Sequence, residues 1–177
     1  MATLDQFKSN LIGGGARANQ FKVLLNVPGT VSAVNNAEFF VSGASLPGQT
    51  ITEVPINYRG RILHVNGDRE FEPWTITIIN DTDFAIRNMI EQWMNVIQDI
   101  ETNTAAPNFS DYVADLTVQQ LGRQNDNVLK THVLKNCWPT AMDAIELNWD
   151  TVSEVERFTV TWRYTDFTGS GTSGGAA

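Results

Sequence analysis

Three acidic residues recur at every second position of the segment Val65–Trp74, which reads VNGDREFEPW. Asp68, Glu70 and Glu72 would lie on one face of an extended strand, because successive side chains of a strand point to opposite faces. Clustered carboxylates of this kind bind hard cations such as Ca²⁺ and Mg²⁺. They also pair with arginines at contacts between proteins. The segment therefore predicts either a metal site or a charged contact surface.

The surrounding residues favour the contact surface. With Asp68 as its first residue, a calcium-binding loop needs glycine at position six and glutamate at position twelve, and Pro73 and Ile79 stand there. Cationic partners are close in the sequence: Arg59, Arg61 and Arg69. Ion pairs across a hairpin or between subunits explain the acids more simply than a metal does, so we expect no metal.

Other residues that could do chemistry lack the necessary companions. His64 and His132 lie in strand patterns without a third nitrogen ligand, and Cys137 is the single cysteine. No strained GxSxG turn is present to hold a catalytic serine. The run Gly13–Ala18 matches a dinucleotide-binding motif, but a helical pattern precedes it and a strand pattern follows it, which is the wrong order. We therefore expect neither enzymatic activity nor a cofactor.

Length and charge set the class of protein. A chain of 177 residues with 42% hydrophobic residues is sufficient for one domain with a full core. The formal net charge of −8 argues against a protein that grips nucleic acid, because such proteins use Lys and Arg to contact phosphates. It does not exclude DNA that must pass without sticking.

The domain is expected over residues 1–167, with residues 1–18 as an arm or short helix. Residues 168–177, rich in Gly, Ser and Ala, are expected to form a flexible tail. No apolar run reaches the roughly 20 residues that cross a bilayer, and Met1–Asn10 does not have the pattern of a secretory signal. We therefore expect synthesis in the cytoplasm and no membrane insertion.

Alternating apolar residues predict a mainly β fold. The expected strands are Phe21–Val27, Glu38–Val41, Tyr58–Val65, Trp74–Ile79, Tyr112–Leu121, Val128–Leu134, Ile145–Trp149 and Val155–Phe167. Asn66-Gly67 is the strongest short hairpin signal, so it is expected to form a turn between two of these strands. Of the five tryptophans, four follow apolar patterns that indicate core packing.

One segment has helical spacing instead. Apolar residues recur every three or four positions from about Asp83 to Ile100, with Asp81 or Thr82 available as the N-cap. The residues expected to pack this helix on a sheet are Ile86, Ile90, Trp93 and Ile97. The expected fold is thus a small β-barrel, or two packed antiparallel sheets, with one principal flanking helix.

Three stretches together resemble the tail tube proteins of contractile-tailed bacteriophages, especially the T4-like group. They are ASLPG at Ala44–Gly48, YRGRILHVNGDREFEPWTITIIND at Tyr58–Asp81, and CWPTAMDAIELNWD at Cys137–Asp150. The final strand, Phe158–Phe167, continues the similarity, which covers about residues 18–167. The resemblance departs in the Gly/Ser/Ala tail and in the polar loop Thr102–Ser110.

The resemblance implies hexameric rings that stack into the tube inside a contractile sheath, in the tail of the virion. Its implied partners are further copies of the chain, the sheath protein, baseplate or tube-initiator proteins, tail-terminator proteins and the genomic DNA that passes through. The ring protein of a phage-like bacteriocin or a type VI secretion system is the alternative of the same architecture. A metal-dependent enzyme on a β-barrel is the alternative of a different class.

A ring or tube needs segments that reach a neighbouring copy. The extended segment Ser45–Asn57 and the charges that follow it suit this role. The expected inter-subunit and ring-stacking residues are Ser45, Leu46, Pro47, Arg59, Arg61, Asp68, Arg69, Glu70 and Glu72. Acids that lined the bore would repel the duplex and keep it from sticking.

Overall fold

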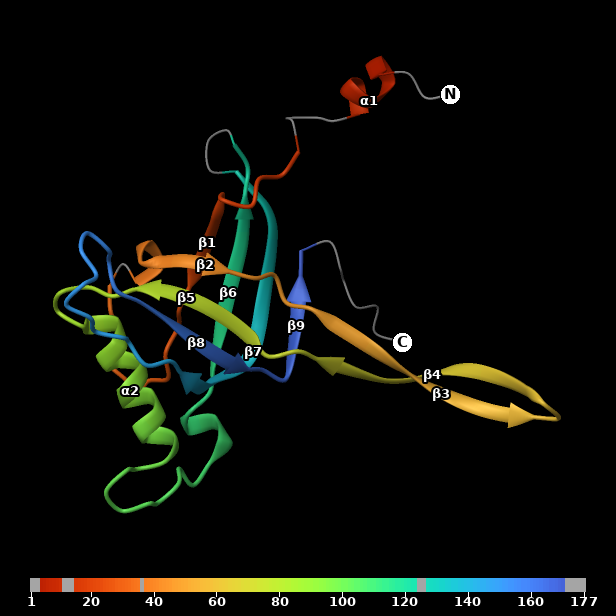
Figure 1. Cartoon of the computed structure of the whole chain (residues 1–177). Helices are drawn as coiled ribbons and strands as arrows, with labels where there is room; N and C mark the ends of the chain where they lie inside the picture. The colour runs from red at the N-terminus through yellow and green to blue at the C-terminus, as the bar shows by residue number, and fades with distance from the viewer. Residues whose placement is uncertain (1–3, 11–14, 36, 124–126, 171–177) are drawn as a thin grey trace.

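The computed structural model describes residues 4–10, 15–35, 37–123 and 127–170 (Figure 1). Nine strands run through these ranges: β1 (Phe21–Leu24), β2 (Val41–Ala44), β3 (Gln49–Tyr58), β4 (Arg61–Phe71), β5 (Trp74–Ile79), β6 (Ala114–Leu121), β7 (Val128–Met142), β8 (Arg157–Arg163) and β9 (Asp166–Gly169). The α-helices are α1 (Leu4–Asn10) and α2 (Ala85–Ile97), and two short 3₁₀ helices are η2 (Ala37–Phe39) and η3 (Phe109–Asp111).

Two antiparallel sheets that share the long strand β7 form the body of the protein. The first half of β7 pairs with β6 and β9, and β1 lies beyond β6. Residues 138–142 of β7 pair instead with β8, which is followed by β5 and β2. Asn136 has a φ of 53°, and the register shifts between Pro139 and Ala141, so β7 turns there from one sheet to the other. The expected arrangement of packed antiparallel sheets with one main helix is confirmed.

The core lies where the sheets face each other and under α2. Phe158, Val160 and Trp162 alternate along β8 and are 2% exposed or less, as their spacing predicts. Trp93 of α2 meets Trp162 edge to face, with ring centroids 5.0 Å apart. The indole Nε1 of Trp93 donates to the carbonyl oxygen of Tyr112 at 2.6 Å, so its polar edge is satisfied where its ring is buried.

Helix α2 is shorter than its apolar pattern predicts. Its buried residues are Ile86, Met89, Ile90 and Trp93, and Ile97 is partly buried. The chain turns extended at Gln98, which forms a bridge with Ala105, so the helix stops before Ile100. Ile100 is 87% exposed, which removes the burial that would have extended the helix.

The expected N-cap is wrong. Phe84 occupies the cap position with a left-handed φ of 52°, and no side chain caps the helix. Asp81 Oδ1 instead accepts a hydrogen bond from the backbone N–H of Thr82 at 2.8 Å. The Asp81 carboxylate thus stabilises the turn before the helix. Because the helix begins only at Ala85, Asp81 lies too far from its first turn to cap it.

Several expected strands have different bounds. Ile145–Trp149 is not a strand but part of the loop Asp143–Glu156, and Glu38–Val41 is mostly the turn η2 that leads into β2. The expected last strand is split into β8 and β9, because the N–H of Thr165 donates to Lys135 at 3.0 Å and the chain changes sheets there. Residues Thr168 and Gly169, expected in the flexible tail, belong to β9. Residues 11–14 and 171–177 lie outside the described residues.

Strands β3 and β4 form a long hairpin, and the expected turn at Asn66-Gly67 is wrong. The turn is at Arg59-Gly60, with φ values of 46° and 79°, while Asn66 lies within β4 and pairs with Glu53. A two-residue turn with positive φ at both positions matches the twist of the strands. Glycine supplies the second position without strain, and arginine accepts the first.

Gly67 has a different task in the hairpin. The register shifts between Ile51 and Glu53, so β4 carries an extra residue opposite Thr52. A Cβ at Gly67 would lie 2.6 Å from Thr52 Oγ1 and 3.0 Å from its carbonyl oxygen. The hydroxyl of Thr52 donates to the carbonyl oxygen of Asp68 at 3.0 Å and closes the bulge. A side chain at position 67 would force the strands apart.

No helix in the described part of the chain is long and apolar enough to cross a membrane.

We predict that Gly67→Ala loosens the hairpin. The added methyl overpacks the bulge, and overpacking costs about 1–3 kcal/mol. Amide hydrogen exchange along β3 and β4 should accelerate relative to the wild type, while exchange in β8 stays unchanged. Gly29→Ala is the matched control, because a Cβ at Gly29 meets nothing within 4 Å. Equal exchange in the two variants would contradict the close approach at Gly67.

We predict that His132 makes stability depend on pH. His132 is 7% exposed, and its Nδ1 has no hydrogen-bond partner within the described residues. Burial, with a smaller contribution from Lys130, lowers its pKa, so the folded protein binds a proton less readily than the unfolded chain. The free energy of unfolding should therefore be highest above a pH of about 6.5, where His132 is neutral in both states. It should decrease as the pH falls below that value.

Urea unfolding at pH 7.5 and pH 5.0 measures this loss. His132→Gln should lose less free energy of unfolding between the two pH values than the wild type does. His64 is present in both proteins, so it does not account for a difference between them. An equal loss in the two proteins would exclude His132 as the cause.

Candidate assembly surfaces

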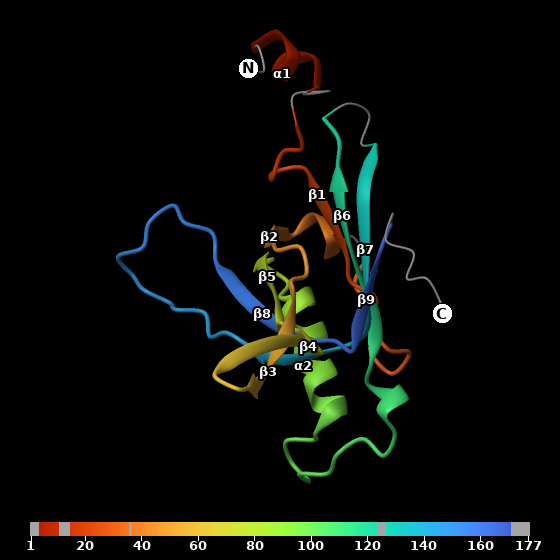
Figure 2. The ribbon, with the colours of Figure 1, turned by 90° about the vertical axis from the view of Figure 1, so that its right-hand side faces the viewer.

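The β3–β4 hairpin projects away from the two sheets (Figures 1 and 2). Both strands are held firmly at its root. The indole Nε1 of Trp74 donates to the carbonyl oxygen of Ser45 at 2.6 Å. The hydroxyl of Tyr164 donates to the carbonyl oxygen of Gly48 at 3.4 Å. On the β4 side, the ring of Phe71 lies 5.7 Å from Tyr164 and 5.6 Å from Phe167. The root is therefore part of the folded body, whereas the rest of the hairpin stands free.

One face of the free hairpin is apolar. Cross-strand partners share a face, and alternate residues along each strand return to it. Val54 pairs with Val65 and Ile56 pairs with Leu63, and Tyr58 follows on the same face. These five residues, which we call the apolar hairpin face, are between 36% and 67% exposed. Nothing in the described chain covers them, so this surface is suited to contact with another molecule.

The opposite face and the tip are mainly polar. Glu53 Oε2 lies 3.2 Å from His64 Nδ1 on the polar face. Arg59 forms the turn, with its guanidinium carbon 5.4 Å from the centroid of the Tyr58 ring. Arg61 pairs with Tyr58 at the start of β4. The free end of the hairpin thus carries two arginines beside the apolar hairpin face.

Asp68, Glu70 and Glu72 do not lie together on one regular face of a strand. The bulge places Asp68 opposite Thr52, and β4 ends at Phe71, before Glu72. Glu70 pairs with Thr50 in the regular register. No cluster of three or more His, Cys, Asp or Glu residues that could hold a metal occurs within the described residues.

The arginines expected to pair with these acids are also separate from them within one copy. The ion pairs of the described residues join Lys22 to Glu38, His64 to Glu53 and Arg87 to Glu91. Arg69 pairs in the ladder with Ile51, on the face opposite to Glu70. The ion-pair alternative across the hairpin is therefore not seen in the single chain, and the alternative between subunits stays a prediction.

The segment expected to reach a neighbour begins at the hairpin root. Ser45 is held through its carbonyl oxygen by Trp74, and Leu46 next to it is 48% exposed. Gly48 lies against Glu72, whose Oε2 would be 3.4 Å from a Cβ at that position. The root thus brings together Ser45–Pro47 and Glu72, two of the expected contact regions, and leaves Arg59 and Arg61 at the far end of the hairpin.

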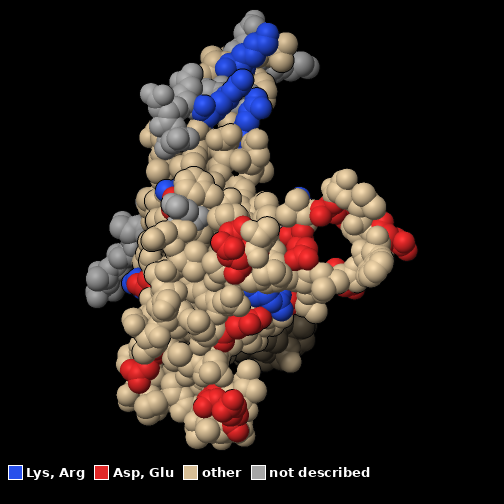
Figure 3. All heavy atoms as spheres, turned by 90° about the vertical axis from the view of Figure 1, so that its left-hand side faces the viewer, with Lys and Arg blue, Asp and Glu red and all other residues tan. Residues whose placement is uncertain are grey.

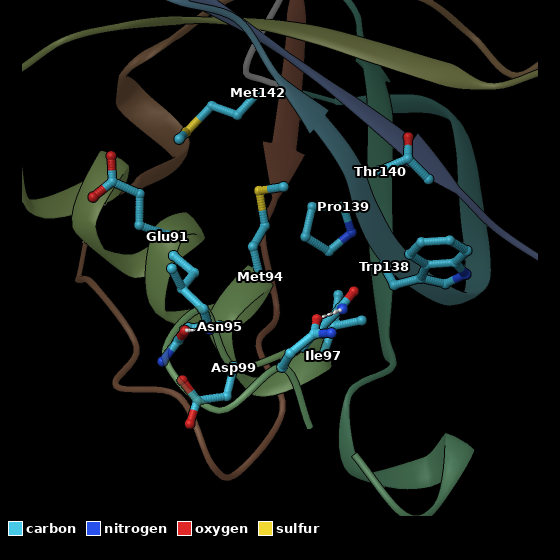
Figure 4. Close-up of a pocket in the computed structure, with 12 residues that line it drawn as sticks. Glu91, Met94, Asn95, Ile97, Asp99, Trp138, Pro139, Thr140 and Met142 are labelled. Atoms are coloured by element: carbon cyan, nitrogen blue, oxygen red, sulfur yellow. Dashed lines mark hydrogen bonds between the residues drawn. The ribbon is translucent and has the colours of Figure 1, made fainter. Parts of the chain in front are cut away.

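Sequence reasoning missed a second surface, a groove of about 690 Å³ between α2 and β7 (Figure 4). Its apolar lining comes from both elements: Met94, Ile97, Trp138, Pro139 and Met142. Glu91 and Asp99 stand on the α2 side. Hydrogen bonds from Glu101 and Thr102 lower the pKa of Asp99, which keeps that carboxylate charged. The sequence did not predict the groove, because the expected strand ended at Leu134. In the structure β7 continues to Met142, and its last residues form one wall of the groove.

A third surface was also missed. The loop Asp143–Glu156 exposes Leu147, Trp149, Val152 and Val155, with Trp149 fully exposed. Its Asn148 side chain accepts from the N–H of Asp150 at 3.0 Å, a turn that ends the alternating pattern of ELNW. The signal available in the sequence was this Asn-Trp-Asp turn, which competes with the short apolar alternation.

The thiol of the single cysteine is enclosed. Cys137 is fully buried, and its burial raises the pKa of the thiol to about 12. A thiol is nucleophilic only as the thiolate, which this environment disfavours at neutral pH. The structure therefore offers surfaces for packing rather than a reactive centre.

Comparison with known proteins agrees with the resemblance seen in the sequence. The family model described as phage tail tube protein matches residues 16–170. The chain is 28% identical to the tail tube protein gp19 of Enterobacteria phage T4 over 149 residues, which cover 84% of this chain and 88% of the relative. It is 29% identical to the tail tube protein of Serratia phage KSP90, with coverage of 93% and 95%.

Solved structures share the fold at low sequence identity. A chain in the sheath/tube terminator of an extracellular contractile injection system matches with a TM-score of 0.65 at 12% identity, covering 88% of this chain and 96% of that one. A chain in the baseplate of the anti-feeding prophage matches with a TM-score of 0.63 at 14% identity, covering 88% and 95%. The likeness extends to a type VI secretion system protein, with a TM-score of 0.51 at 7% identity and coverage of 86% and 83%.

The family model spans most of this chain, and two relatives named as tail tube proteins match along nearly their whole length. The chain belongs to the phage tail tube protein family, whose members are structural proteins and not enzymes.

Proposed function

We propose that six copies of this tail tube protein close into a ring and that the rings stack into the inner tube of a contractile phage tail. The observation that carries this proposal is the apolar hairpin face, which is exposed on a strand pair that leaves the body of the protein. A two-stranded hairpin is at best marginally stable alone in water. A neighbouring copy that covers this face would stabilise the hairpin, and the same contact would link the two copies in the polymer.

The shape of the contact favours a ring or filament over a simple dimer. The hairpin is one surface of the molecule, and the surface that receives it must lie elsewhere on the next copy. Contacts between two different patches close into rings when the rotation permits and otherwise extend as filaments. A tube of stacked rings uses such contacts both around the ring and along the axis.

The charged residues of the hairpin give the contact its register. At the free end, Arg59 and Arg61 stand beside the apolar hairpin face, and at the other end Asp68, Glu70 and Glu72 are near the root. Arg69 and the root residues Ser45, Leu46 and Pro47 complete the proposed contact set. Basic and acidic ends of one hairpin can meet acidic and basic residues of neighbours, and this fixes orientation more than it adds affinity.

The tube would serve as the conduit for genomic DNA during ejection. Six copies of a chain with a formal net charge of −8 carry −48 in each ring. Duplex DNA bears about one negative charge per 1.7 Å of its axis. Like charges repel within a screening length of about 8 Å at physiological salt, so an acidic bore keeps the duplex centred and free to slide.

The partners of the assembled tube follow from this role. We propose that the outside of the tube contacts the tail sheath protein and that its ends contact baseplate or initiator proteins and a tail terminator. The protein would be made in the cytoplasm of the bacterial host and built into the virion tail. A bacteriocin or secretion tube is the second candidate, because its fold is shared, but the relatives of similar length are named as phage tail tubes.

We predict that the apolar hairpin face is necessary for tube assembly. Ile56→Asp places a charge on this face and should abolish the tubes that negative-stain microscopy shows for the wild type. Asn57→Asp is the matched control, because Asn57 is the next residue of β3 and points to the opposite face. Circular dichroism should be the same for both variants. Tubes from Ile56→Asp as long as those of the wild type would reject the hairpin as the contact.

We predict that assembled tubes do not retain duplex DNA. Tubes sedimented with linear duplex DNA at 0.15 M salt should leave the DNA in the supernatant, because the net charges of both are negative. Lowering the salt should not produce binding, since weaker screening strengthens the repulsion. DNA that pellets with the tubes and is released by salt would contradict a repelling conduit.

A further inference from the structure

Helix α1 is a short segment with two exposed apolar side chains. It stands clear of the two sheets (Figures 1 and 2). Leu4 and Phe7 are 67% and 62% exposed, and Lys8 lies in its last turn. A seven-residue helix is not stable by itself in water, so it needs a packing partner to persist. The described residues of the same chain leave the side chains of Leu4 and Phe7 largely uncovered.

The loop Asp143–Glu156 also exposes apolar side chains. In Figure 3 it stands out from the body as a ring with acidic side chains around its rim. It lines a hollow of about 810 Å³ almost by itself. Trp149 is fully exposed, and Leu147 and Val152 beside it are 80% and 79% exposed. An exposed tryptophan among exposed aliphatic residues indicates a surface that another molecule covers.

The loop is held in place at both ends. The N–H of Asp143 donates to Thr159 at 2.9 Å, and Arg87 Nη1 donates to the carbonyl oxygen of Asp143 at 3.4 Å. At the other end, Asn80 donates through its backbone N–H and its side chain to Glu156, at 2.9 Å and 2.8 Å. Both ends of the loop are thus fixed on the body of the protein.

The N-terminal arm and the loop differ in the sign of their charge, because residues 4–20 contain Asp5 against Lys8 and Arg17. The loop carries five acids and neither Lys nor Arg between residues 143 and 156. Lys8 and Arg17 belong to the N-terminal arm, and Figure 3 shows blue side chains gathered at the end that carries α1. A segment with two exposed apolar side chains and an adjacent cation complements a loop that exposes apolar side chains and carries acids.

We propose that α1 of one copy docks into the loop Asp143–Glu156 of a second copy. Leu4 and Phe7 would cover Trp149, while Lys8 would face the acidic rim at Asp150. The ten residues between α1 and β1 span at most about 35 Å, which allows the arm to cross to a neighbour. This contact rests on the proposed tube and adds to the hairpin a second, separate link between copies.

The α2–β7 groove is the competing site for the arm. It too combines an apolar lining with acidic residues, Glu91 and Asp99. The loop is favoured because Trp149 is fully exposed, whereas Met94 and Ile97 in the groove are already partly buried on the core. Ile100 lines the groove and is 87% exposed, so it provides a comparison position for the experiment.

Disulfide cross-linking of assembled protein tests the contact. In Phe7→Cys combined with Trp149→Cys, every copy carries both halves of the contact, so mild oxidation should produce a ladder of linked chains on a non-reducing gel. The buried Cys137 does not compete. Phe7→Cys with Ile100→Cys is the matched control and should give only the dimers that Phe7→Cys alone gives.

The outcomes separate this proposal from the proposed function. Tubes with a ladder through position 149 support the docking. Tubes that give no ladder, or a ladder through position 100 instead, overturn the docking and leave the tube intact. Wild-type protein that forms no tubes, with or without an initiating complex, overturns the proposed function and the docking with it.

A charge exchange tests the same contact without replacing Trp149. Lys8→Glu should raise the critical concentration for tube growth by about two- to fivefold, the range of an exposed ion pair. Lys8→Glu combined with Asp150→Lys should restore it, whereas Lys8→Glu combined with Asp99→Lys, in the groove, should not. A critical concentration that Lys8→Glu leaves unchanged, or that only the groove exchange restores, would overturn the docking at the loop.

Discussion

The assembly proposed for this protein depends on one constraint: no described residue of the chain covers the apolar face of the β3–β4 hairpin. Val54, Ile56, Leu63, Val65 and Tyr58 form a continuous surface on a strand pair that has solvent on both sides. An isolated pair of strands is only marginally stable in water, and its apolar face is stabilised when another surface covers it. The strands of the two sheets pack on the core, whereas nothing within the described residues covers this face of the hairpin.

The body of the protein provides the fixed mount that this hairpin requires. Tyr164 contacts both strands at the root, through its hydroxyl to Gly48 and through its ring to Phe71. Burial raises the pKa of the Tyr164 hydroxyl, so it remains a hydrogen-bond donor at neutral pH. Because β8 and β9 meet at this residue, the direction of the hairpin is set by the packing of the two sheets. A rigid root allows repeated copies to meet with the same geometry.

Charge opposes the association that the apolar surfaces favour. A formal net charge of −8 on each copy causes repulsion within a polymer, and this repulsion grows with the number of copies. The chain offsets it by separating its charges, with cations near α1 and at the hairpin tip, and acids on the loop Asp143–Glu156. In the proposed tube, the same excess of acid that makes assembly more demanding would keep a polyanion from adhering.

The sequence by itself determined what depends on local spacing. Alternation of apolar residues placed β5 and the inward face of β8, and three- and four-residue spacing placed α2 with Ile86, Ile90 and Trp93 on its packed side. The lack of companions for His64, His132 and Cys137 was also visible, because motifs for metals and nucleophiles are patterns of residue type and distance along the chain.

Tertiary structure alone decided which of two glycine-containing dipeptides makes the hairpin turn. Arg59-Gly60 and Asn66-Gly67 both permit positive φ, and the choice fell to the first because the root contacts of Gly48 and Phe71 fix the strand register. The same holds for Trp149, whose apolar character predicts burial but whose loop is held outside the sheets by contacts at Asp143 and Glu156. Such outcomes depend on partners distant in the sequence, and a local pattern does not contain them.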